Sequence, residues 1–284
     1  MITSQPERKA TQMQTFQAQS DDAALLAQTA QAVHQTGQIL LARFNPDDRP
    51  ADMTELMAMI DANDDAASAN LRPQLLAIRP QARWLEDEKA SGPLPPGEWW
   101  VVDPVEGNVN HIHGMGDWSV TATLVRDNEA VLTVVDEPLT ARVYTALRGG
   151  GAFLNGREIR TSAKLDLGAA MVSTAQATPG EGAATHARTG KSIIAMLNHA
   201  LLVKAAVPSA MQLIHVAAGR LDCFWQPGSV LSGLVAGALL VREGGGVVTD
   251  WQGAPWTTAS DSFAASAPGI HAAVVQVLRQ VEGQ

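Results

Sequence analysis

The stretch of sequence that decides the fold spans residues 100–114 and reads WVVDPVEGNVNHIHG. It opens with the bulky, β-branched run Trp100–Val102, which is typical of a short buried strand. Asp103 follows that run, and Pro104 cannot donate a backbone hydrogen bond to a neighbouring strand. We therefore expect the strand to deliver Asp103 at its carboxyl end and the chain to turn at Pro104.

Two acids three residues apart make this turn a candidate metal site. Asp103 and Glu106 offer carboxylate oxygens, and the backbone carbonyl of Val105 lies between them. Hard divalent cations such as Mg²⁺ prefer oxygen ligands of this kind. Gly107 follows and lets backbone N–H groups approach an anion, especially where a helix starts. Acids in turns are often only solvated caps, so the motif indicates a metal site if other acids converge on it.

Further acids that can join this site lie upstream. Residues 86–88 read EDE and follow the apolar pair Trp84-Leu85, so one of these acids could end a strand at the same site. Asp61 and Asp64 are three residues apart in a helical stretch and therefore share one helix face. The spacing to Leu71 favours Asp64, whereas the pattern at the start of the helix allows Asp61.

Around these motifs, the chain changes from helical to strand-like and then alternates. Two helices are expected first, the second bent near Pro73, and Asn155-Gly156 is a strong signal for a hairpin turn. This order predicts an α/β (α+β) fold in which helices and a mixed sheet form layers. The expected helices cover residues 21–40, 53–78, 191–201, 208–219, 234–242 and 270–281, and the expected strands cover 99–102, 118–125, 130–135, 142–147, 158–161, 171–174, 202–207, 221–225, 246–249 and 262–266.

Composition limits the class of protein. The chain has 284 residues, with 20 Lys and Arg against 29 Asp and Glu, so its net charge is −9. An acidic protein of this kind is not expected to bind nucleic acid or an anionic membrane surface, because both need a basic face. The single cysteine, Cys223, excludes an intramolecular disulfide and is expected in the core. No signal peptide or apolar span is recognisable, so a cytoplasmic location is expected.

We expect one folded domain preceded by a short leader. Residues 1–20 are rich in Gln, Ser and Thr and lack an apolar period, which predicts a flexible leader. Residues 21–284 would form a single domain, with an N-terminal α+β part over about 21–165 and a C-terminal α/β part over about 166–284.

Residues 100–114 resemble the W-x-x-D-P-[LI]-D-G-T-x-N-F-x-H-G signature of the inositol monophosphatase family of Mg²⁺-dependent sugar phosphatases. Residues 143–156 are similar to its A-x-x-G-x-G-A-x-x-N-G hairpin, residues 216–222 to its V-A-A-G-R-L-D helix end, and residues 236–246 to its A-G-x-L-I-V-x-E-A-G-G segment. The likeness covers about residues 55–280. It implies a layered αβαβα sandwich, a homodimer, bound Mg²⁺ and a small phosphorylated substrate.

The departures from the family pattern fall at the site. The resemblance implies metal binding by Asp87, which is shorter than the family's Glu, and by Asp103, the Val105 carbonyl and Glu106, which replaces an Asp. The family's next metal-binding Asp corresponds to Gly233, so that ligand is missing. The resemblance therefore implies fewer metal ions than the family usually holds.

The substrate-binding positions differ as well. Asn108 stands where the family has a Thr that orients the attacking water, and Gln226 stands where an acid commonly contacts substrate hydroxyls. Ser209 lies in the segment expected to discriminate between substrates. The Gly107 and Asn108 amides would cradle the phosphate.

Two hypotheses follow from this pattern. In the first, the protein is a divergent Mg²⁺-dependent phosphatase acting on a small phosphorylated polyol, sugar or nucleotide, with Asp87, Asp64 and Asn108 handling the attacking water. In the second, the losses at Asn108, Gln226 and Gly233 leave a catalytically impaired family member with a binding, scaffolding or regulatory role. A third possibility is different chemistry in the same pocket.

Overall fold

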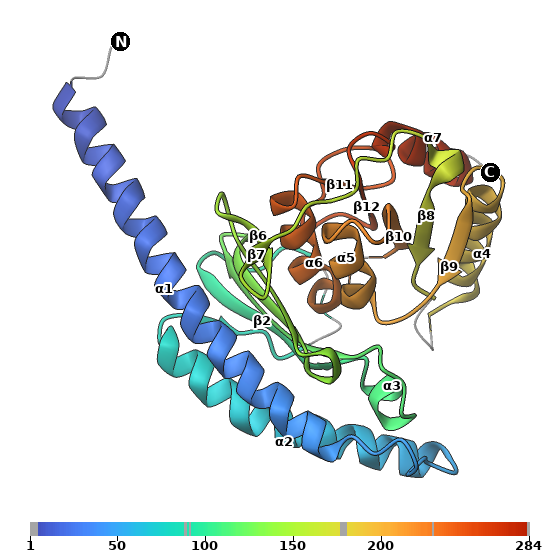
Figure 1. Cartoon of the computed structure of the whole chain (residues 1–284), viewed down its shortest axis with the longest axis horizontal. Helices are drawn as coiled ribbons and strands as arrows, with labels where there is room; N and C mark the ends of the chain where they lie inside the picture. The colour runs from blue at the N-terminus through green and yellow to red at the C-terminus, as the bar shows by residue number, and fades with distance from the viewer. Residues whose placement is uncertain (1–4, 88–89, 91, 177–180, 229, 283–284) are drawn as a thin grey trace.

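The structure is a computed structural model that describes residues 5–87, 90, 92–176, 181–228 and 230–282 (Figure 1). The helices in these residues are α1 (Gln5–Arg43), α2 (Met53–Ile78), α3 (Asn108–Ile112), α4 (Ala183–Leu197), α5 (Ser209–Ala217), α6 (Leu231–Glu243) and α7 (His271–Glu282), with short 3₁₀ turns at Pro138–Thr140 and Leu167–Ala169.

The strands form two sheets. The first sheet has seven strands in the order β1-β2-β3-β4-β5-β6-β7, and the second has five in the order β11-β12-β10-β8-β9. The first comprises β1 (Arg83–Trp84), β2 (Glu98–Glu106), β3 (Ser119–Arg126), β4 (Glu129–Glu137), β5 (Arg142–Leu147), β6 (Gly151–Leu154) and β7 (Arg157–Glu158). The second comprises β8 (Met171–Thr174), β9 (Leu202–Ala205), β10 (Cys223–Pro227), β11 (Val247–Thr249) and β12 (Ser262–Ser266).

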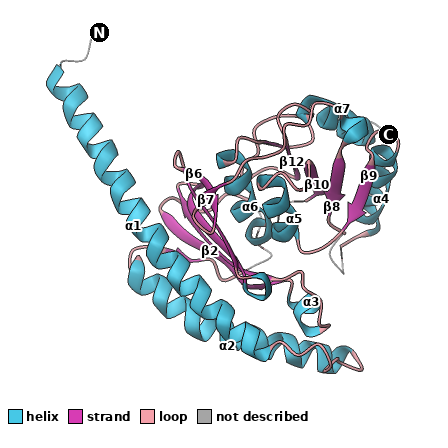
Figure 2. Ribbon diagram, in the orientation of Figure 1, coloured by secondary structure: helices cyan, strands magenta, loops and turns pink. Residues whose placement is uncertain are grey.

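Helices cover the outer faces of both sheets and fill the space between them, as Figure 2 shows. One core cluster joins α1 and α2 to the first sheet, and another joins the first sheet to α5, α6 and the second sheet. A third core cluster packs α4 and α7 against the far face of the second sheet. The expected αβαβα sandwich is therefore confirmed.

Strand β2 shows how the residue pattern divides its side chains between two core layers. Trp100 and Val102 belong to the cluster with α1 and α2, while Val101 between them belongs to the cluster with α5 and α6. Successive side chains of a strand point to opposite faces of the sheet. A bulky apolar run without polar alternation is therefore what a strand covered on both faces requires.

The expectation that the strand ends at Asp103 is wrong, because β2 continues to Glu106. Asp103 pairs with Thr121 and Glu106 pairs with Ser119, so three steps on β2 oppose two on β3. The extra residue makes a β-bulge, and a bulge accepts a proline that cannot donate to the ladder. Pro104 therefore bends the strand without ending it.

The first helix also differs from the expectation, because it begins at Gln5 and not near Asp21. The segment expected as a flexible leader consists largely of good helix formers such as Gln, Ala, Glu, Arg and Met. It lacks only the apolar period on which the expectation was based. The helix then ends at Arg43, and α2 begins after its N-cap residue Asp52, whose carboxylate accepts from the N–H groups of Thr54 and Glu55.

Two tight turns follow their sequence signals. Asn155 and Gly156 both have positive φ, which a two-residue hairpin turn of type I′ requires. Asp127 and Asn128 do the same between β3 and β4. No helix in the described part of the chain is both long and apolar enough to cross a membrane.

Candidate active site

A pocket of about 580 Å³ lies where the bulged end of β2 meets α2, the first turns of α5 and α6, and the end of β10. It contains nearly every site residue that the sequence predicted. Its lining includes Asp64, Asp103, Val105, Glu106, Gly107, Asn108, Ser209, Gln226, Ser232 and Gly233.

The bulge in β2 brings both acids of the motif to this pocket. The Asp103 carboxylate accepts a hydrogen bond from the Val105 backbone N–H at 3.1 Å, which closes the bend around Pro104. Glu106 is buried, and its Oε1 accepts from the backbone N–H of Ala210 in the first turn of α5 at 3.0 Å. Glu106 thus satisfies one of the unpaired N–H groups that begin a helix.

Gly107 ends this segment with φ +91°, and α3 starts at the next residue. A Cβ at Gly107 would lie 2.7 Å from the carbonyl oxygen of Asp117 and 2.9 Å from Pro208 Cγ. Only glycine combines this backbone conformation with so close a contact. The glycine therefore places the α3 N-terminus against the pocket.

The electrostatics of the pocket are dominated by negative charge. Its lining contains four acids, Asp64, Asp103, Glu106 and Glu181, and none of the described lining residues is Lys, Arg or His. Burial and the neighbouring Glu106 charge raise the pKa of Asp103 well above its usual range. Burial and the negative charge of Asp103 raise the pKa of Asp64 to about 6. The carboxylates are thus close enough to repel one another.

Asp61 and Asp64 lie differently with respect to this pocket. Asp64 lines the pocket, and its Oδ1 accepts a hydrogen bond from Asn108 Nδ2 at 2.8 Å. Asp61 is exposed and is not among the lining residues. The buried stripe of α2 is formed by Asn63, Ala67, Leu71 and Leu75, so Asp64 borders the buried face and Asp61 does not.

Of the acids at residues 86–88, neither Glu86 nor Asp87 lines the pocket. Asp87 is exposed and is not a lining residue, and Glu86 forms an exposed ion pair with Arg72. Glu88 lies outside the described residues. Strand β1 is only two residues long, so the chain leaves the sheet before it reaches these acids.

The far side of the pocket carries the predicted substrate contacts. Ser209 Oγ donates a hydrogen bond to Gln226 Oε1 at 2.8 Å, which links the start of α5 to β10. Gly233, in the first turn of α6, faces the same space. A Cβ added there would lie 3.8 Å from Glu106 Oε1 and 3.8 Å from Ser209 Cβ, so the position has room for a Cβ.

Sequence reasoning missed Asn63 and Glu181. Asn63 is 5% exposed and contacts Asn108 from behind, while Glu181 lines the pocket. The sequence did hold one signal for Asn63. It is the first residue of the buried stripe of α2, a position where Leu or Ala is expected, and asparagine is a poor helix former. Glu181 gave no such signal.

A family model for the inositol monophosphatase family matches residues 21–282. The chain belongs to this family. An inositol-1-monophosphatase of Rhizobium meliloti is 33% identical over 239 residues, which cover 81% of this chain and 86% of the relative. The Nus factor SuhB of Xylella fastidiosa is 37% identical over 155 residues, which cover 55% of this chain and 56% of that protein.

Solved structures of the family share the fold. The extragenic suppressor protein suhB of Bartonella henselae matches with a TM-score of 0.78 at 25% identity, over 90% of this chain and 99% of that one. The inositol monophosphatase of Anabaena (Nostoc) sp. PCC 7120 matches with a TM-score of 0.75 at 23% identity, over 91% of this chain and 96% of that one.

The donor set of the pocket fits Mg²⁺ that is also held by waters and substrate oxygens. No group of three Asp, Glu, His or Cys side chains in the described residues converges closely enough to hold a metal without other ligands. However, Mg²⁺ in phosphate-handling sites is usually held by one or two carboxylates together with waters and substrate oxygens. Asp103 and Glu106, with the Val105 carbonyl between them, provide that smaller set, and their mutual repulsion is what a divalent cation relieves.

Proposed function

We propose that this chain is a divergent Mg²⁺-dependent phosphatase of the inositol monophosphatase family, which hydrolyses a small phosphorylated polyol, sugar or nucleotide. The observation that carries the proposal is the charge of the pocket, with four acids and no described Lys, Arg or His in its lining. A phosphate dianion would be repelled by such a pocket unless a cation bound first. A phosphatase of this family therefore needs its metal here for binding as well as for chemistry.

The carboxylates of Asp103 and Glu106 and the carbonyl of Val105 would hold the ion. When bound, Mg²⁺ supplies the positive charge that neutralises the phosphate and stabilises charge on the leaving oxygen. We propose fewer ions than the family usually holds, because Gly233 contributes no carboxylate and Asp87 is not among the lining residues.

In this proposal Asp64 acts as the base. A water attacks phosphorus in line, a new P–O bond forms, and its proton passes to the Asp64 carboxylate while the ester P–O bond breaks. The leaving alkoxide then takes a proton from solvent. Asn108 Nδ2 donates to Asp64 Oδ1 and so fixes the direction in which this carboxylate faces the pocket. Asn108 orients the base here and cannot relay a proton as a hydroxyl does.

The Gly107 and Asn108 amides would contact phosphate oxygens, and Ser209 and Gln226 would contact the rest of the substrate. Ser209 Oγ donates to Gln226 Oε1 at 2.8 Å, which leaves the Gln226 amide N–H groups as donors. With its oxygen bonded to Ser209, Gln226 presents N–H donors to the substrate, whereas a carboxylate would present only acceptors. It therefore favours a substrate with a carbonyl, ring or ether oxygen at that end.

Phosphate release from a panel of polyol, sugar and nucleotide monophosphates, with and without Mg²⁺, tests the proposal. We expect Mg²⁺-dependent release that Asp103→Asn and Asp64→Asn abolish. Asp61→Asn is the matched control, since it removes the same charge from an exposed position on α2 outside the pocket. No Mg²⁺-dependent release from any substrate would overturn the proposal.

A second candidate is a regulatory or scaffolding role in a catalytically impaired protein. The similarity to the Nus factor SuhB of Xylella fastidiosa, together with Gly233 and Asn108 in place of the family's Asp and Thr, supports it. In that case Mg²⁺ calorimetry would show no binding and no substrate would turn over.

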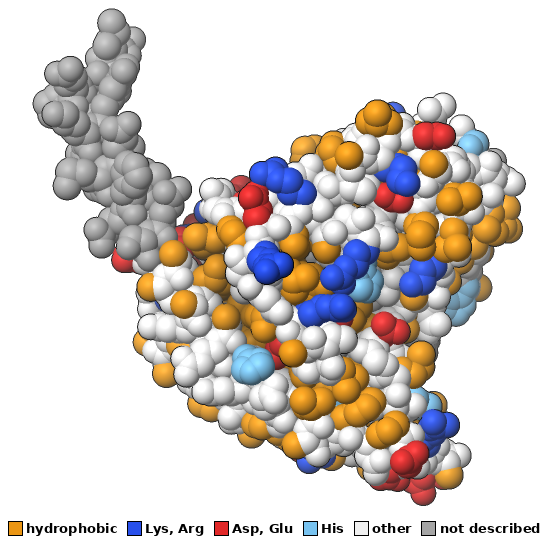
Figure 3. Space-filling view, in the orientation of Figure 1, with side chains coloured by type: hydrophobic (Ala, Val, Ile, Leu, Met, Phe, Trp, Pro, Cys, Tyr) orange, Lys and Arg blue, Asp and Glu red, His pale blue; other side chains and the backbone are white. Residues whose placement is uncertain are grey.

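We further propose that the protein acts as a cytoplasmic homodimer. Exposed apolar side chains gather on α4 and on the edge strand β9, a region that Figure 3 shows as rich in hydrophobic residues. Ile194, Leu197, Leu201 and Leu202 are 63%, 59%, 67% and 43% exposed, and we call them the α4–β9 surface. A second copy of the chain would cover this surface, because exposed contiguous apolar patches usually mark protein interfaces.

A further inference from the structure

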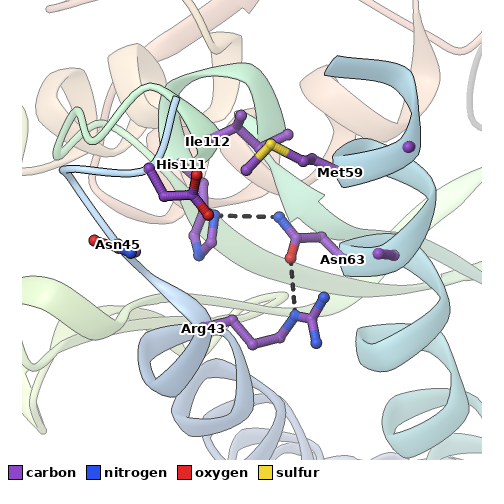
Figure 4. A pocket seen from close by; sticks show the side chains of 9 residues that line it. Arg43, Asn45, Met59, Asn63, His111 and Ile112 are labelled. Carbon is purple, nitrogen blue, oxygen red and sulfur yellow. Dashed lines mark hydrogen bonds between the residues drawn. The ribbon is translucent and has the colours of Figure 1, made fainter. Parts of the chain in front are cut away.

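A line of hydrogen bonds connects the end of α1 to the pocket through a residue that does not line the pocket. Asn63, in α2, is 5% exposed and uses its whole amide group. Its Oδ1 accepts from Arg43 Nε at 2.9 Å. Its Nδ2 donates to Asn108 Oδ1 at 2.9 Å and to His111 Nδ1 at 3.2 Å. Figure 4 shows a second pocket, of about 410 Å³ and separate from the candidate active site, with Asn63 between Arg43 and His111 in its lining and the bonds to both.

Two neighbours fix which way the Asn63 amide faces. The guanidinium of Arg43 can only donate, so the atom facing it must be the oxygen. His111 Nε2 lies 3.0 Å from the carbonyl oxygen of Leu40, which can only accept, so Nε2 carries the proton and Nδ1 accepts. Burial lowers the pKa of His111, which keeps the ring neutral. Phe44 and Trp118 each pack edge-on against the His111 ring and stack on each other, which holds the plane of the imidazole.

The orientation of Asn63 then dictates that of Asn108. Asn63 donates to Asn108 Oδ1, so Asn108 must turn its Nδ2 the other way. That nitrogen donates both its hydrogens, to Asp64 Oδ1 at 2.8 Å and to the Ile60 carbonyl oxygen at 3.2 Å. Both amide hydrogens of Asn63 and both of Asn108 therefore have acceptors. If the oxygen and nitrogen of the Asn108 amide were exchanged, its oxygen would face the Asp64 carboxylate oxygen.

We propose that Asn63 is a positioning residue of the active site, which sets the amide of Asn108 so that it holds the Asp64 carboxylate toward the pocket. The inference rests on the proposed function for the role of Asp64 as the base. Asn63 contributes no contact to the substrate. Its effect reaches the reaction only through Asn108.

Asn63→Asp is the central variant, because it keeps the shape and the bond to Arg43 but removes both donors. Asn108 then has to turn its nitrogen toward position 63 and its oxygen toward Asp64. We expect kcat to fall by between about tenfold and about 100-fold while KM stays within about twofold, since misplacement affects chemistry more than binding. Asn63→Ala gives the same direction without a new charge.

Asn70→Ala is the matched control. Asn70 lies on the same helix and is also tied to α1, through Thr36 Oγ1 at 2.9 Å, but it contacts no pocket residue in the described hydrogen bonds. It should lower thermal stability as Asn63→Ala does and leave kcat unchanged. Equal losses of kcat in both variants would show a purely structural role and overturn the inference.

The double variant Asn63→Ala/Asn108→Ala separates the two effects. In the Asn108→Ala background, Asn63→Ala should change kcat by less than about twofold, because residues acting through one partner are not additive. Additive losses would overturn the inference.

A readout independent of activity distinguishes failure of this inference from failure of the proposed function. In protein labelled with ¹⁵N-asparagine, the side-chain amide protons of Asn108 should exchange slowly in the wild type. They should exchange at least about tenfold faster in Asn63→Ala, where nothing holds the Asn108 oxygen, and be unchanged in Asn70→Ala. A wild type without phosphatase activity but with this exchange pattern would contradict the proposed function alone. Unchanged Asn108 exchange in Asn63→Ala would contradict the inference itself.

Discussion

Glu106 illustrates how one methylene group changes the surroundings of a candidate metal ligand. Its longer side chain reaches Ala210 N–H at the start of α5, and its Oε1 lies 3.8 Å from where a Cβ on Gly233 would be. Part of the space that a side chain at position 233 would occupy is therefore next to the Glu106 carboxylate. The two departures from the family pattern face each other across one corner of the pocket.

Gly233→Asp tests whether the missing carboxylate limits metal binding. The position has room for a Cβ, but the pocket already carries four acids. Without Mg²⁺ we expect a lower melting temperature, because a fifth negative charge adds repulsion. With Mg²⁺ we expect about tenfold tighter binding of the ion by calorimetry. Gly233→Asn is the neutral control, and Mg²⁺ affinity equal in both variants would contradict this expectation.

At the same scale, all of the predicted site residues except Asp87 line the pocket, but the contacts among them could not be predicted. Asp103, Val105 and Glu106 of the D-P-x-E-G motif line one pocket together, because neighbours in sequence stay neighbours in space. Asp87 could not be placed from sequence, since its position depends on how the chain leaves a two-residue strand. Asn63 was missed because its importance comes from contacts with Asn108 and Arg43, which are distant in sequence.

At the scale of single elements, α5 and α6 pack so closely that one glycine is essential. A Cβ built on Gly237 in α6 would overlap the side chain of Leu213 in α5. Both helices lie between the two sheets, so neither can move away freely. This contact also fixes the first turns of α5 and α6, which carry Ser209 and Gly233 to the pocket.

Gly237→Ala should therefore destabilise the protein by about 1–3 kcal/mol, although alanine is the better helix former. Gly190→Ala in α4 is the matched control, because a Cβ there meets nothing within 4 Å. It should be neutral or stabilise by up to about 1 kcal/mol. Urea unfolding of both variants measures the difference, and equal stabilities would refute the packing argument.

His271, at the start of α7, forms hydrogen bonds to two strands of the second sheet, and its protonation should make the stability of the protein depend on pH. Its ring lies between Thr249 Oγ1 at 3.0 Å and Ser266 Oγ at 2.8 Å, and burial lowers the pKa of His271 to about 4. In the unfolded chain the histidine pKa returns to about 6.5. The unfolded state therefore binds the proton first, and stability is lost as pH falls from about 6.5 toward 4.

We expect the protein to lose on the order of 1–2 kcal/mol of unfolding free energy through His271 between pH 7 and pH 5. His271→Gln should show a smaller loss over the same interval, while His199→Gln, at an exposed position, should behave like the wild type. Urea unfolding at the two pH values measures this. A His271→Gln variant with the same pH dependence as the wild type would contradict the assignment.

For the whole molecule, the five-layer arrangement was predictable and several of its boundaries were not. The expected strands at residues 142–147, 171–174 and 262–266 agree with β5, β8 and β12 residue for residue. For β12 the turn residues are clear, since Ser260 and Asp261 precede the strand and Pro268 and Gly269 follow it closely. The start of α1 was missed because its first residues are helix formers without an apolar period. The extension of β2 past Pro104 was missed because a proline usually ends a strand, and here it lies in a bulge.

The α4–β9 surface is where assembly can be tested. Leu197→Asp places a charge at the proposed contact and should shift the protein from dimer to monomer in light scattering. Leu165→Asp is the control, because Leu165 is 83% exposed and lies outside this surface. A dimer that persists in Leu197→Asp would show that the interface does not include the α4–β9 surface. A monomeric wild type would contradict the proposal of a dimer.

The central claim is that Asp103 and Glu106 hold a magnesium ion in a pocket whose described lining carries four acids and no Lys, Arg or His. Titration calorimetry with Mg²⁺ on the wild-type protein, Asp103→Asn and Asp61→Asn tests it most directly. The account predicts saturable binding to the wild type and to Asp61→Asn, and none to Asp103→Asn. Equal Mg²⁺ binding in all three proteins, or no binding to the wild type, would contradict it.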